Sequence, residues 1–327
     1  MEPPTLVPCS YDVRYEPDSV APLGDEVLAC IHFGPAARAG DGDPRRIRVP
    51  LRQFGAAPLM EVWRSRRPVE RGWSDGFGYA HNGDVMMGQL VVDEATVAAD
   101  LDATSARAYV HIEALLRRLG YPAWLRIWNY LAHITRGAGD HERYRLFTHG
   151  RYRALALRPG FEAHLPAATA IGTFDGGLLI FFLAARSPGV QAENPRQVSA
   201  FNYPRQYGIR SPSFSRATRK HWAQGRHLYV SGTAAVIGHE TAHAGDPLQQ
   251  LDETVRNLQA LLASAHMEGA RPLGLKLYAR REQDFEALRQ RALEVYGAGA
   301  PLLCLHGEVC RRDLLTEIEA LYADPEG

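Results

Sequence analysis

Features typical of secreted, membrane-spanning or zinc-binding proteins are scarce in this sequence of 327 residues. Its four cysteines form neither a disulfide framework nor a paired CxxC pattern of the zinc-binding kind. The best apolar run, residues 176–185, is shorter than the roughly 18 residues of a membrane-spanning helix. Residues 1–22 lack the basic and then apolar stretch of a signal peptide. We therefore expect a cytoplasmic protein.

An excess of charge of one sign is also absent, because Lys plus Arg and Asp plus Glu both total 37. The overall charge therefore predicts neither nucleic acid nor a membrane surface as a partner, and any binding site for an anion must be local. Apolar material is plentiful, since 46% of the residues are hydrophobic. At this length the chain can form one large domain or two modest ones with a sizeable core.

A helix followed by a strand is predicted in the first half of the chain. Residues 106–120 repeat apolar side chains at helical spacing, with Ser105 as the predicted N-cap and Gly120 as the C-terminal stop. A strand is predicted over residues 124–130, after Pro122.

The same order of a helix followed by a strand is predicted again in the second half of the chain. Asp246 and Pro247 predict an N-cap and a first helical residue, and apolar side chains then repeat at helical spacing as far as Leu262. Residues 273–279 alternate as in a strand. The chain is then predicted to end in one helix and two strands, over residues 285–295, 301–306 and 315–322. An internal duplication of an α+β unit stays open, because few residues are identical between the halves.

Between the two halves, residues 170–174 and 178–185 are apolar runs joined by Asp175-Gly176-Gly177. Because glycine accepts positive φ, this spacing predicts a β-hairpin. Together the elements predict an α+β fold with two α+β units, in which helices pack on one face of each mixed sheet. We place an N-terminal α+β domain at residues 1–150 and a C-terminal catalytic domain at residues 151–327.

The motif His239-Glu240-Thr241-Ala242-His243 matches the HExxH pattern of zinc proteases. On a helix this spacing sets two imidazoles one turn apart for zinc, with a carboxylate as base. Here the motif follows a glycine-rich, strand-like run and stands just before the helix predicted after Asp246, so there is too little room for a long helix. A third ligand is also unspecified. We interpret the motif as a loop that holds a turn or touches the substrate, and we predict no metal site.

Residues 201–216, FNYPRQYGIRSPSFSR, concentrate arginine, tyrosine and serine among Pro and Gly. No regular amphipathic pattern explains this segment. Its composition predicts a rigid loop whose guanidinium groups suit carboxylates and whose hydroxyls suit neutral oxygens. A small, hydroxylated dianion would fit such a loop, and a solvated surface loop is the alternative.

Together with residues 230–241 and 307–319, this loop resembles the chorismatase family, which includes 3-hydroxybenzoate synthases and chorismate hydrolases. The resemblance extends from about Trp128 to the C-terminus, and the first hundred residues carry little of it. It implies an enzyme that releases the enolpyruvyl group of chorismate as pyruvate and forms 3-hydroxybenzoate, with 4-hydroxybenzoate as an alternative second product.

The chain from Leu228 onward also resembles the Rid superfamily of enamine deaminases, which combine a Ser-Gly strand, a long helix with an asparagine, here Asn257, and a terminal Glu-Ile-Glu strand. This resemblance implies a chorismate-mutase-like α+β fold and neither a metal nor an organic cofactor. Rid proteins are usually trimers with sites between subunits. Two α+β halves in one chain can instead form the site themselves, so monomer and homotrimer both stay open.

The resemblance places the catalytic acid at Glu317, the first glutamate of Glu317-Ile318-Glu319. Protonating the methylene carbon of an enolpyruvyl ether requires an acid that is neutral near pH 7, and a partly desolvated carboxyl meets this need. On a strand Glu317 and Glu319 share one face, so one carboxyl is expected to raise the pKa of the other. In the family a cysteine seven residues before the acid accompanies the aromatising route, and Cys310 stands there. Solvated glutamates and a merely buried cysteine are the alternatives.

Substrate-binding residues are expected in the loop, at the end of the strand predicted over residues 273–279, and in a family block of the N-terminal half. The four arginines expected to bind carboxylates and the two hydroxyl donors are Arg151, Arg210, Arg216, Arg280, Tyr207 and Ser213. Gly232 and Ala234 are expected to leave room for the ring, although a strand glycine also marks bulges.

Other functions stay open: a chorismate hydrolase that forms a dihydroxycyclohexadiene carboxylate, a Rid-type imine deaminase, a non-catalytic module for aromatic acids, and a zinc hydrolase. The arginine-rich loop and the large N-terminal half argue against the deaminase. The presence of Glu317 argues against the non-catalytic module.

Overall fold

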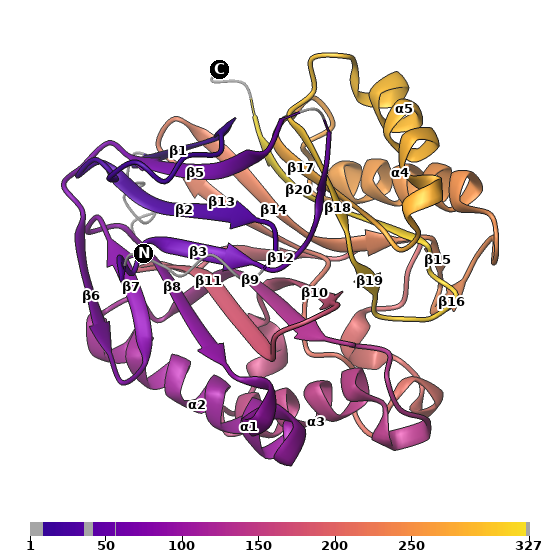
Figure 1. Cartoon of the computed structure of the whole chain (residues 1–327), viewed down its shortest axis with the longest axis horizontal. Helices are drawn as coiled ribbons and strands as arrows, with labels where there is room; N and C mark the ends of the chain where they lie inside the picture. Colours follow the sequence, from indigo (N-terminus) through magenta and orange to yellow (C-terminus); the bar gives the residue numbers. More distant parts are fainter. Residues whose placement is uncertain (1–8, 36–41, 56, 325–327) are drawn as a thin grey trace, which may run out of the picture.

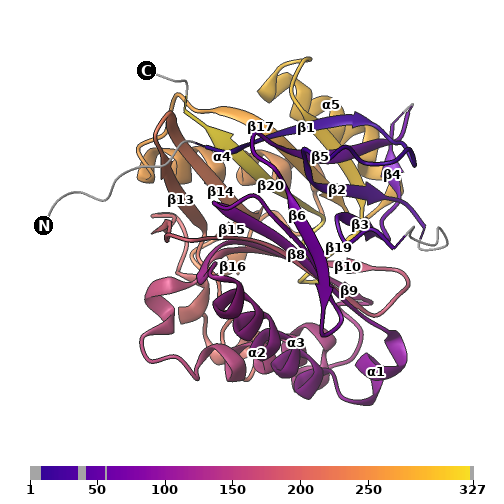
Figure 2. The same ribbon diagram turned by 90° about the vertical axis from the view of Figure 1, so that its left-hand side faces the viewer.

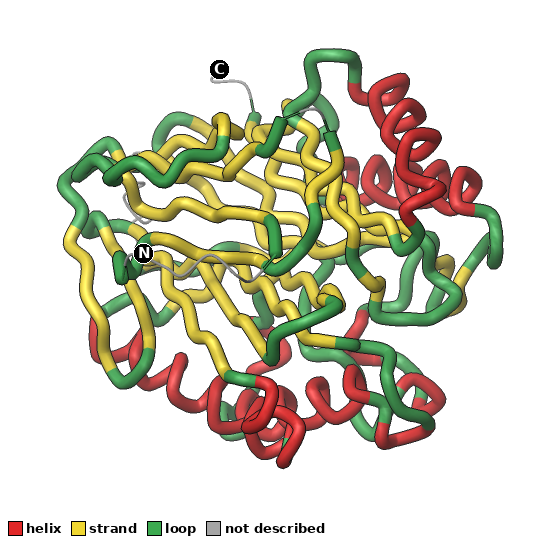
Figure 3. The backbone as a smooth tube through the Cα atoms, viewed as in Figure 1, coloured by secondary structure: helices red, strands yellow, loops and turns green. Residues whose placement is uncertain are grey.

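The computed structural model describes residues 9–35, 42–55 and 57–324, whose strands form three main sheets (Figure 1). Strands lie at the centre of the molecule and the longer helices lie on its outside (Figure 3). Residues 1–8, part of the segment expected to lack a signal peptide, lie outside the described residues. Among the described residues, no helix has the length and apolar character needed to cross a membrane.

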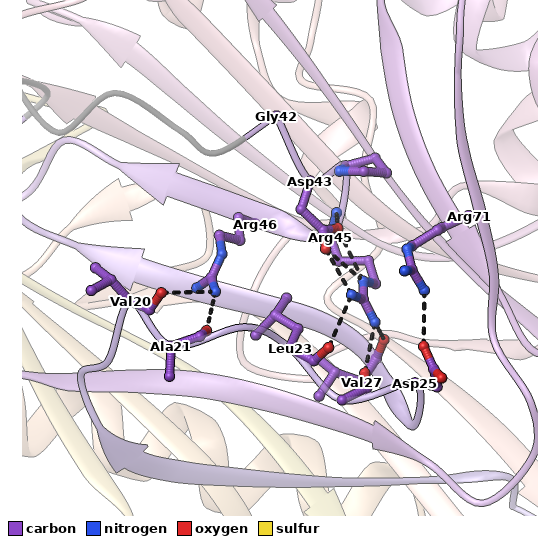
Figure 4. A network of polar contacts seen from close by, with 12 residues as sticks. Val20, Ala21, Leu23, Asp25, Val27, Gly42, Asp43, Arg45, Arg46 and Arg71 are labelled. Carbon is purple, nitrogen blue, oxygen red and sulfur yellow. Dashed lines mark hydrogen bonds and ion pairs between the residues drawn. The ribbon is translucent and has the colours of Figure 1, made fainter.

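The first sheet has four strands in the order β1-β5-β2-β3, namely β1 (Tyr11–Pro17), β5 (Leu59–Ser65), β2 (Val27–Phe33) and β3 (Arg46–Val49). Every residue of β2 is buried, which fits its central position between β5 and β3. The loop before β2 is tied to the start of β3 by the buried Arg45, which binds the Asp43 carboxylate and the carbonyl oxygens of Gly24 and Val27 (Figure 4).

The second sheet has seven strands in the order β19-β10-β9-β11-β8-β7-β6. Their bounds are β19 (Glu308–Val309), β10 (Ala167–Thr173), β9 (Ala123–Ala132), β11 (Leu178–Ala185), β8 (Val85–Val92), β7 (Phe77–His81) and β6 (Glu70–Ser74). Helices α1 (Glu94–Ala99), α2 (Leu101–Leu119) and α3 (Arg143–Leu155) lie together along the outer face of this sheet (Figures 1 and 2).

The third sheet has the order β12-β13-β14-β20-β17-β18-β4. Its strands are β12 (Val190–Ala192), β13 (Ala217–Trp222), β14 (Gly225–Ala234), β20 (Thr316–Ala323), β17 (Arg271–Ala279), β18 (Leu302–His306) and β4 (Gln53–Phe54). Helices α4 (Pro247–Ser264) and α5 (Phe285–Tyr296) pack on one face, where Ile318 of β20 meets them. The other face meets the first two sheets in a shared apolar layer that includes Trp63, Trp128 and Tyr278.

The remaining elements are short. A two-stranded hairpin consists of β15 (Val236–Ile237) and β16 (Glu240–Thr241). Five 3-10 turns, η1 to η5, span Gly139–His141, Phe161–His164, Ala200–Asn202, Arg205–Tyr207 and Glu282–Asp284.

The predicted α+β class is confirmed, and helices pack on one face of the second and third sheets. Local capping signals were informative: Asp246 caps α4, whose first residue is Pro247, and Gly120 ends α2 in the left-handed conformation. The predicted N-cap at Ser105 is wrong, because Asp100 caps α2 and Ser105 lies buried inside the helix.

The predicted hairpin of residues 170–174 and 178–185 is also wrong, because β9 lies between β10 and β11. β10 pairs with β9 in parallel and β11 pairs with β9 antiparallel. The glycine-rich connection crosses the end of β9, where the Ala132 amide donates to the Gly177 carbonyl over 2.9 Å. A side chain at Gly177 would place its Cβ 2.2 Å from the Val92 carbonyl oxygen, so this glycine serves a close crossing and not a tight turn.

The division into domains at residue 150 stays a prediction. The sheets themselves exchange strands across that position, since β10 and β11 complete the second sheet and β4 joins the third.

Candidate active site

A cavity of about 320 Å³ lies between the second and third sheets. Its walls come from β14, from the start of β20, from residues 310–314, from the arginine-rich loop and from the start of α3. A small extension of about 30 Å³ continues inward between α3 and β10, and it shares Cys310 and Glu317 with the main cavity. Both walls therefore come from one chain.

Glu317 lies at the floor of this cavity and is only 4% exposed. Alternation along β20 places Ile318 against the helices and Glu317 on the opposite face, toward the second sheet. Gly232 of β14 makes room for it, because a Cβ at that position would lie 1.9 Å from Glu317 Oε1. Gly232 and Ala234 both line the cavity, as expected from the sequence.

The Glu317 carboxyl is held in its protonated form. Burial raises the pKa of Glu317 to about 8, and the negative charge of Glu319 adds to this effect, while Arg126 and Arg216 oppose it. Near neutral pH the group therefore retains a proton and can donate it.

Glu319, two residues later on the same face, is held in the opposite state. It accepts hydrogen bonds from Arg126 Nη2 at 2.9 Å, Trp128 Nε1 at 2.8 Å and Lys276 Nζ at 2.9 Å. Burial alone would raise the pKa of Glu319, but Lys276 and Arg126 hold it below its ordinary value. The expected coupling between the two glutamates therefore raises the pKa of Glu317.

Cys310 follows β19 and lines both parts of the cavity together with Glu317. Burial, followed by the nearby Glu317, raises the pKa of the Cys310 thiol to about 12, although a hydrogen bond with Tyr144 partly opposes this shift. The group is thus a neutral thiol and not a thiolate, so it is better suited to move a proton than to attack as a nucleophile.

Two of the expected arginines border the cavity with unused donors. Arg216 is buried, donates to the Val198 carbonyl at 2.8 Å and to the Tyr203 hydroxyl at 2.7 Å, and its Nε finds no partner among the described residues. Arg151 of α3 lines the inward extension and stacks on the Tyr109 ring at 5.0 Å. Its Nε and Nη2 also find no partner in the described part of the chain. Buried unpaired guanidinium donors are costly unless a ligand accepts from them.

Arg311 is a cavity residue that the sequence analysis missed. Its guanidinium lies 4.0 Å from the centre of the Tyr207 ring, and it donates to the His239 carbonyl over 2.8 Å. Tyr207 lines the cavity, as expected. The only sequence signal for Arg311 is its place directly after Cys310.

Three expected substrate-binding residues are not among those lining the cavity. Arg280 binds the carbonyl oxygens of Val309, Arg311 and Leu314, so it fixes the loop that carries Cys310. Arg210 is exposed and lies over the Tyr152 ring. Ser213 is buried, while its two neighbours in sequence face the cavity.

The HExxH motif supplies the second strand, β16, of the small β15–β16 hairpin and does not form a helix, as its context predicted. His239 packs edge-on against Tyr207, and His243 lies 3.4 Å from the Glu253 carboxylate. Within the described residues, no group of three or more His, Cys, Asp or Glu side chains is arranged to hold a metal ion.

Comparisons with known proteins agree with one another. Residues 61–184 match the family model described as chorismatase FkbO/Hyg5-like, N-terminal. The chain is 36% identical to a 3-hydroxybenzoate synthase of Streptomyces hygroscopicus, over 92% of this chain and 93% of that protein. It is 35% identical to a chorismatase of Streptomyces rapamycinicus, over 99% of this chain and all of that protein. A crystal structure of chorismatase superposes with a TM-score of 0.84 at 32% identity, covering 97% of this chain and 99% of that one. Since these matches include the N-terminal part, the expectation that the first hundred residues carry little of the resemblance is wrong.

Proposed function

The chain belongs to the chorismatase family, and on this premise we propose that it converts chorismate to pyruvate and 3-hydroxybenzoate. The observation that carries this proposal is a protonated, buried carboxyl, Glu317, at the floor of a cavity bordered by arginines. Chorismate is a dianion whose enolpyruvyl ether has a basic carbon, so it requires an acid together with cationic partners.

In the first step, the Glu317 carboxyl donates its proton to the terminal methylene carbon of the enolpyruvyl group. This transfer forms the methyl group of pyruvate and leaves an oxocarbenium ion at the ether carbon. The Glu317 carboxylate that remains stabilises this cation, because the buried site offers little water to screen the interaction. One residue therefore provides both the proton and the counter-charge.

The arginines hold the two carboxylates of the substrate. We assign one carboxylate to Arg151 in the inner extension and the other to Arg216 and Arg311 in the main cavity, where Tyr207 supports Arg311 by ring stacking. Guanidinium groups suit this task because they bind carboxylates with two parallel hydrogen bonds. Fixing both ends of the molecule places the methylene carbon next to Glu317.

In the second step, the hydroxyl oxygen on the neighbouring ring carbon bonds to the ring carbon that carries the ether, whose bond to the pyruvate oxygen breaks and releases pyruvate. The bond between the hydroxyl oxygen and its original ring carbon then breaks, and the carbon that now carries the oxygen loses its hydrogen as the ring becomes aromatic. Of the two protons released, one returns to the phenol oxygen and the other restores the Glu317 carboxyl. Chorismate thereby divides into pyruvate and hydroxybenzoate with no atom gained or lost, so no oxidant, reductant or cofactor is required. We assign the assistance of proton transfer at the ring to the neutral Cys310 thiol, a role supported by its position beside Glu317 in the cavity lining. Capture of the cation by water would instead give pyruvate and a dihydroxycyclohexadiene carboxylate.

The test is to incubate the purified protein with chorismate and to measure pyruvate with coupled lactate dehydrogenase, while chromatography and mass spectrometry identify the ring product. We expect pyruvate and 3-hydroxybenzoate in equal amounts, and a loss of rate of about 10²- to 10⁴-fold for Glu317→Gln. A dihydroxycyclohexadiene product would show that water captures the cation and that the ring does not become aromatic. A 4-hydroxybenzoate product would show that the hydroxyl ends on a different ring carbon. No pyruvate would overturn the proposal.

We also propose that the protein acts in the cytoplasm, where thiols stay reduced, since all four of its cysteines are free. Because both walls of the cavity come from one chain, a single copy suffices for the site.

A further inference from the structure

A second polar cluster lies in the layer between the three sheets, on the same side of β20 as Glu317. Lys276 of β17 is at its centre, with its Nζ 2.6 Å from Glu61 Oε2 of the first sheet and 2.9 Å from Glu319 Oε1. Arg126 of the second sheet binds the other oxygen of Glu319 at 2.9 Å. All four side chains are buried. Through its Glu61 carboxylate, the first sheet thus contacts the cluster that lies beside Glu317.

Charge within this cluster is balanced by two cations and two carboxylates. Burial alone would lower the pKa of Lys276, but Glu319 and Glu61 raise it well above its ordinary value, so its ammonium group stays charged. Glu319 takes one hydrogen bond from each cation, while Glu61 forms an ion pair with Lys276 and accepts a hydrogen bond from Trp63 Nε1 at 2.6 Å. The third carboxyl, Glu317, forms no ion pair among the described residues, since its neighbour Arg126 is bound to Glu319 and Arg216 donates to Val198 and Tyr203.

We propose that Glu61 and Lys276 are positioning residues for the catalytic acid: they hold Glu319 as a permanent buried negative charge that keeps Glu317 protonated. This inference rests on the proposed function for its catalytic meaning. Glu61 and Lys276 do not line the catalytic cavity, so they act on Glu317 through Glu319 and through the net charge of the cluster. The space around the cluster is only about 30 Å³ and is bounded by aromatic rings, so little water can screen these charges.

Other charged and titratable groups also face the two glutamates. Those that influence Glu317 are Glu319, Arg126, Arg216, Cys310 and Tyr144. Those that influence Glu319 or its partner Lys276 are Arg126, Glu61, Tyr15, Tyr130 and Tyr278. The tyrosines are neutral, because burial raises the pKa of Tyr15, Tyr130 and Tyr278 above their ordinary value. Glu61 and Glu319 are therefore the two negative charges whose removal leaves the cluster with a net positive charge.

The test compares Glu319→Gln and Glu61→Gln with the wild-type protein in the pH dependence of kcat/KM, whose basic limb reports loss of the proton from the free acid. Each variant keeps an oxygen acceptor but removes one negative charge, so the limb should move to lower pH. We expect a shift of about one pH unit for Glu61→Gln and a larger one for the nearer Glu319. Tyr15→Phe is the matched control, since it removes a neutral hydroxyl that donates to Leu275 in the same layer and should leave the limb in place.

A second measurement follows the Glu317 carboxyl directly, by infrared titration of its protonated band without chorismate, with Glu317→Gln identifying the band. If the protein proved inactive on chorismate, this titration would still show whether Glu61→Gln lowers the pH at which Glu317 loses its proton. If Glu319→Gln does not fold, the infrared titration of Glu61→Gln against the wild-type protein is sufficient to test the inference. A Glu61→Gln variant that is less active at every pH, with the limb and the titration unmoved, would reduce Glu61 to a purely structural role and overturn the inference.

Discussion

Buried arginines in the first sheet and in the catalytic cavity are used in opposite ways. Arg45, 2% exposed, has each of its three nitrogens bonded, to Asp43 and to the carbonyl oxygens of Gly24 and Val27 (Figure 4). Arg151, 3% exposed, leaves Nε and Nη2 without a partner among the described residues. A buried arginine that is fully paired stabilises the fold, whereas one with unused donors costs stability until a ligand accepts from them.

The same contrast separates the two glutamates of β20. Glu319 is surrounded by donors and stays ionised, while Glu317 has no ion pair with a cation in the described part of the chain and keeps its proton. Arg151 and Glu317, the unpaired members of the two comparisons, face the cavity. Glu319 lies behind the cavity and Arg45 lies far from it. Unpaired buried polar groups therefore mark where the substrate is expected, and their removal should have different consequences from removal of the paired ones.

The largest expected effect concerns Glu317 and pH. Its pKa in the folded protein is about 8, above its ordinary value of 4.5, so the folded state keeps a proton that the unfolded state has released. The contribution of Glu317 to the free energy of unfolding should therefore be largest below about pH 4.5 and fall by about 1.4 kcal/mol per pH unit up to about pH 8. Glu317→Gln removes this contribution, so the stability of the variant relative to the wild-type protein should rise with pH over this range.

Urea unfolding of both proteins at pH 5, 6, 7 and 8 provides the check, because the contributions of all other groups cancel in the difference. A difference that stays constant with pH would show that Glu317 is ionised in the folded protein. It would then be unable to serve as the acid.

Much of this contrast was readable from local sequence. Alternation along the last strand placed Glu317 and Glu319 on one face, and the resemblance to the chorismatase family identified which of them is the acid. The opposite states of the two carboxyls were not readable, because they depend on Lys276, Arg126 and Glu61, which come from three different sheets.

Local signals failed where a distant partner decides the outcome. The glycines at 176 and 177 look the same in a tight hairpin turn and in a crossing over the end of β9, and only the insertion of β9 between β10 and β11 distinguishes them. The surroundings of Arg280 and Arg311 also depend on partners that local sequence does not reveal. Backbone carbonyls of residues 309–314 capture Arg280, while Tyr207, about a hundred residues earlier, holds Arg311 at the cavity.

The next effect tests the paired side of the comparison. Arg45→Met leaves the Asp43 carboxylate and the carbonyl oxygens of Gly24 and Val27 without their buried donor. We expect a loss of about 3 kcal/mol in the free energy of unfolding, seen as a lower denaturation midpoint. The kcat/KM of the folded protein should not change, since Arg45 lies directly before β3 of the first sheet and outside the cavity lining. A large loss of kcat/KM at a temperature where the variant is folded would contradict the division between structural and catalytic arginines.

The smallest expected effect tests the unpaired side with Arg151→Met. Because Arg151 Nε and Nη2 have no partner in the described chain, their loss should leave the free energy of unfolding unchanged or raise it. The loss of a charge-assisted bond to a substrate carboxylate should cost about 1.5–3 kcal/mol, or about 10- to 100-fold in kcat/KM. Arg153→Met is the matched control, because Arg153 lies on the same helix and pairs with Asp102 at the surface, so kcat/KM should be unaffected. If Arg151→Met instead destabilised the protein and left kcat/KM unchanged, Arg151 would be a structural arginine like Arg45. An unpaired buried donor would then no longer indicate a substrate contact in this fold.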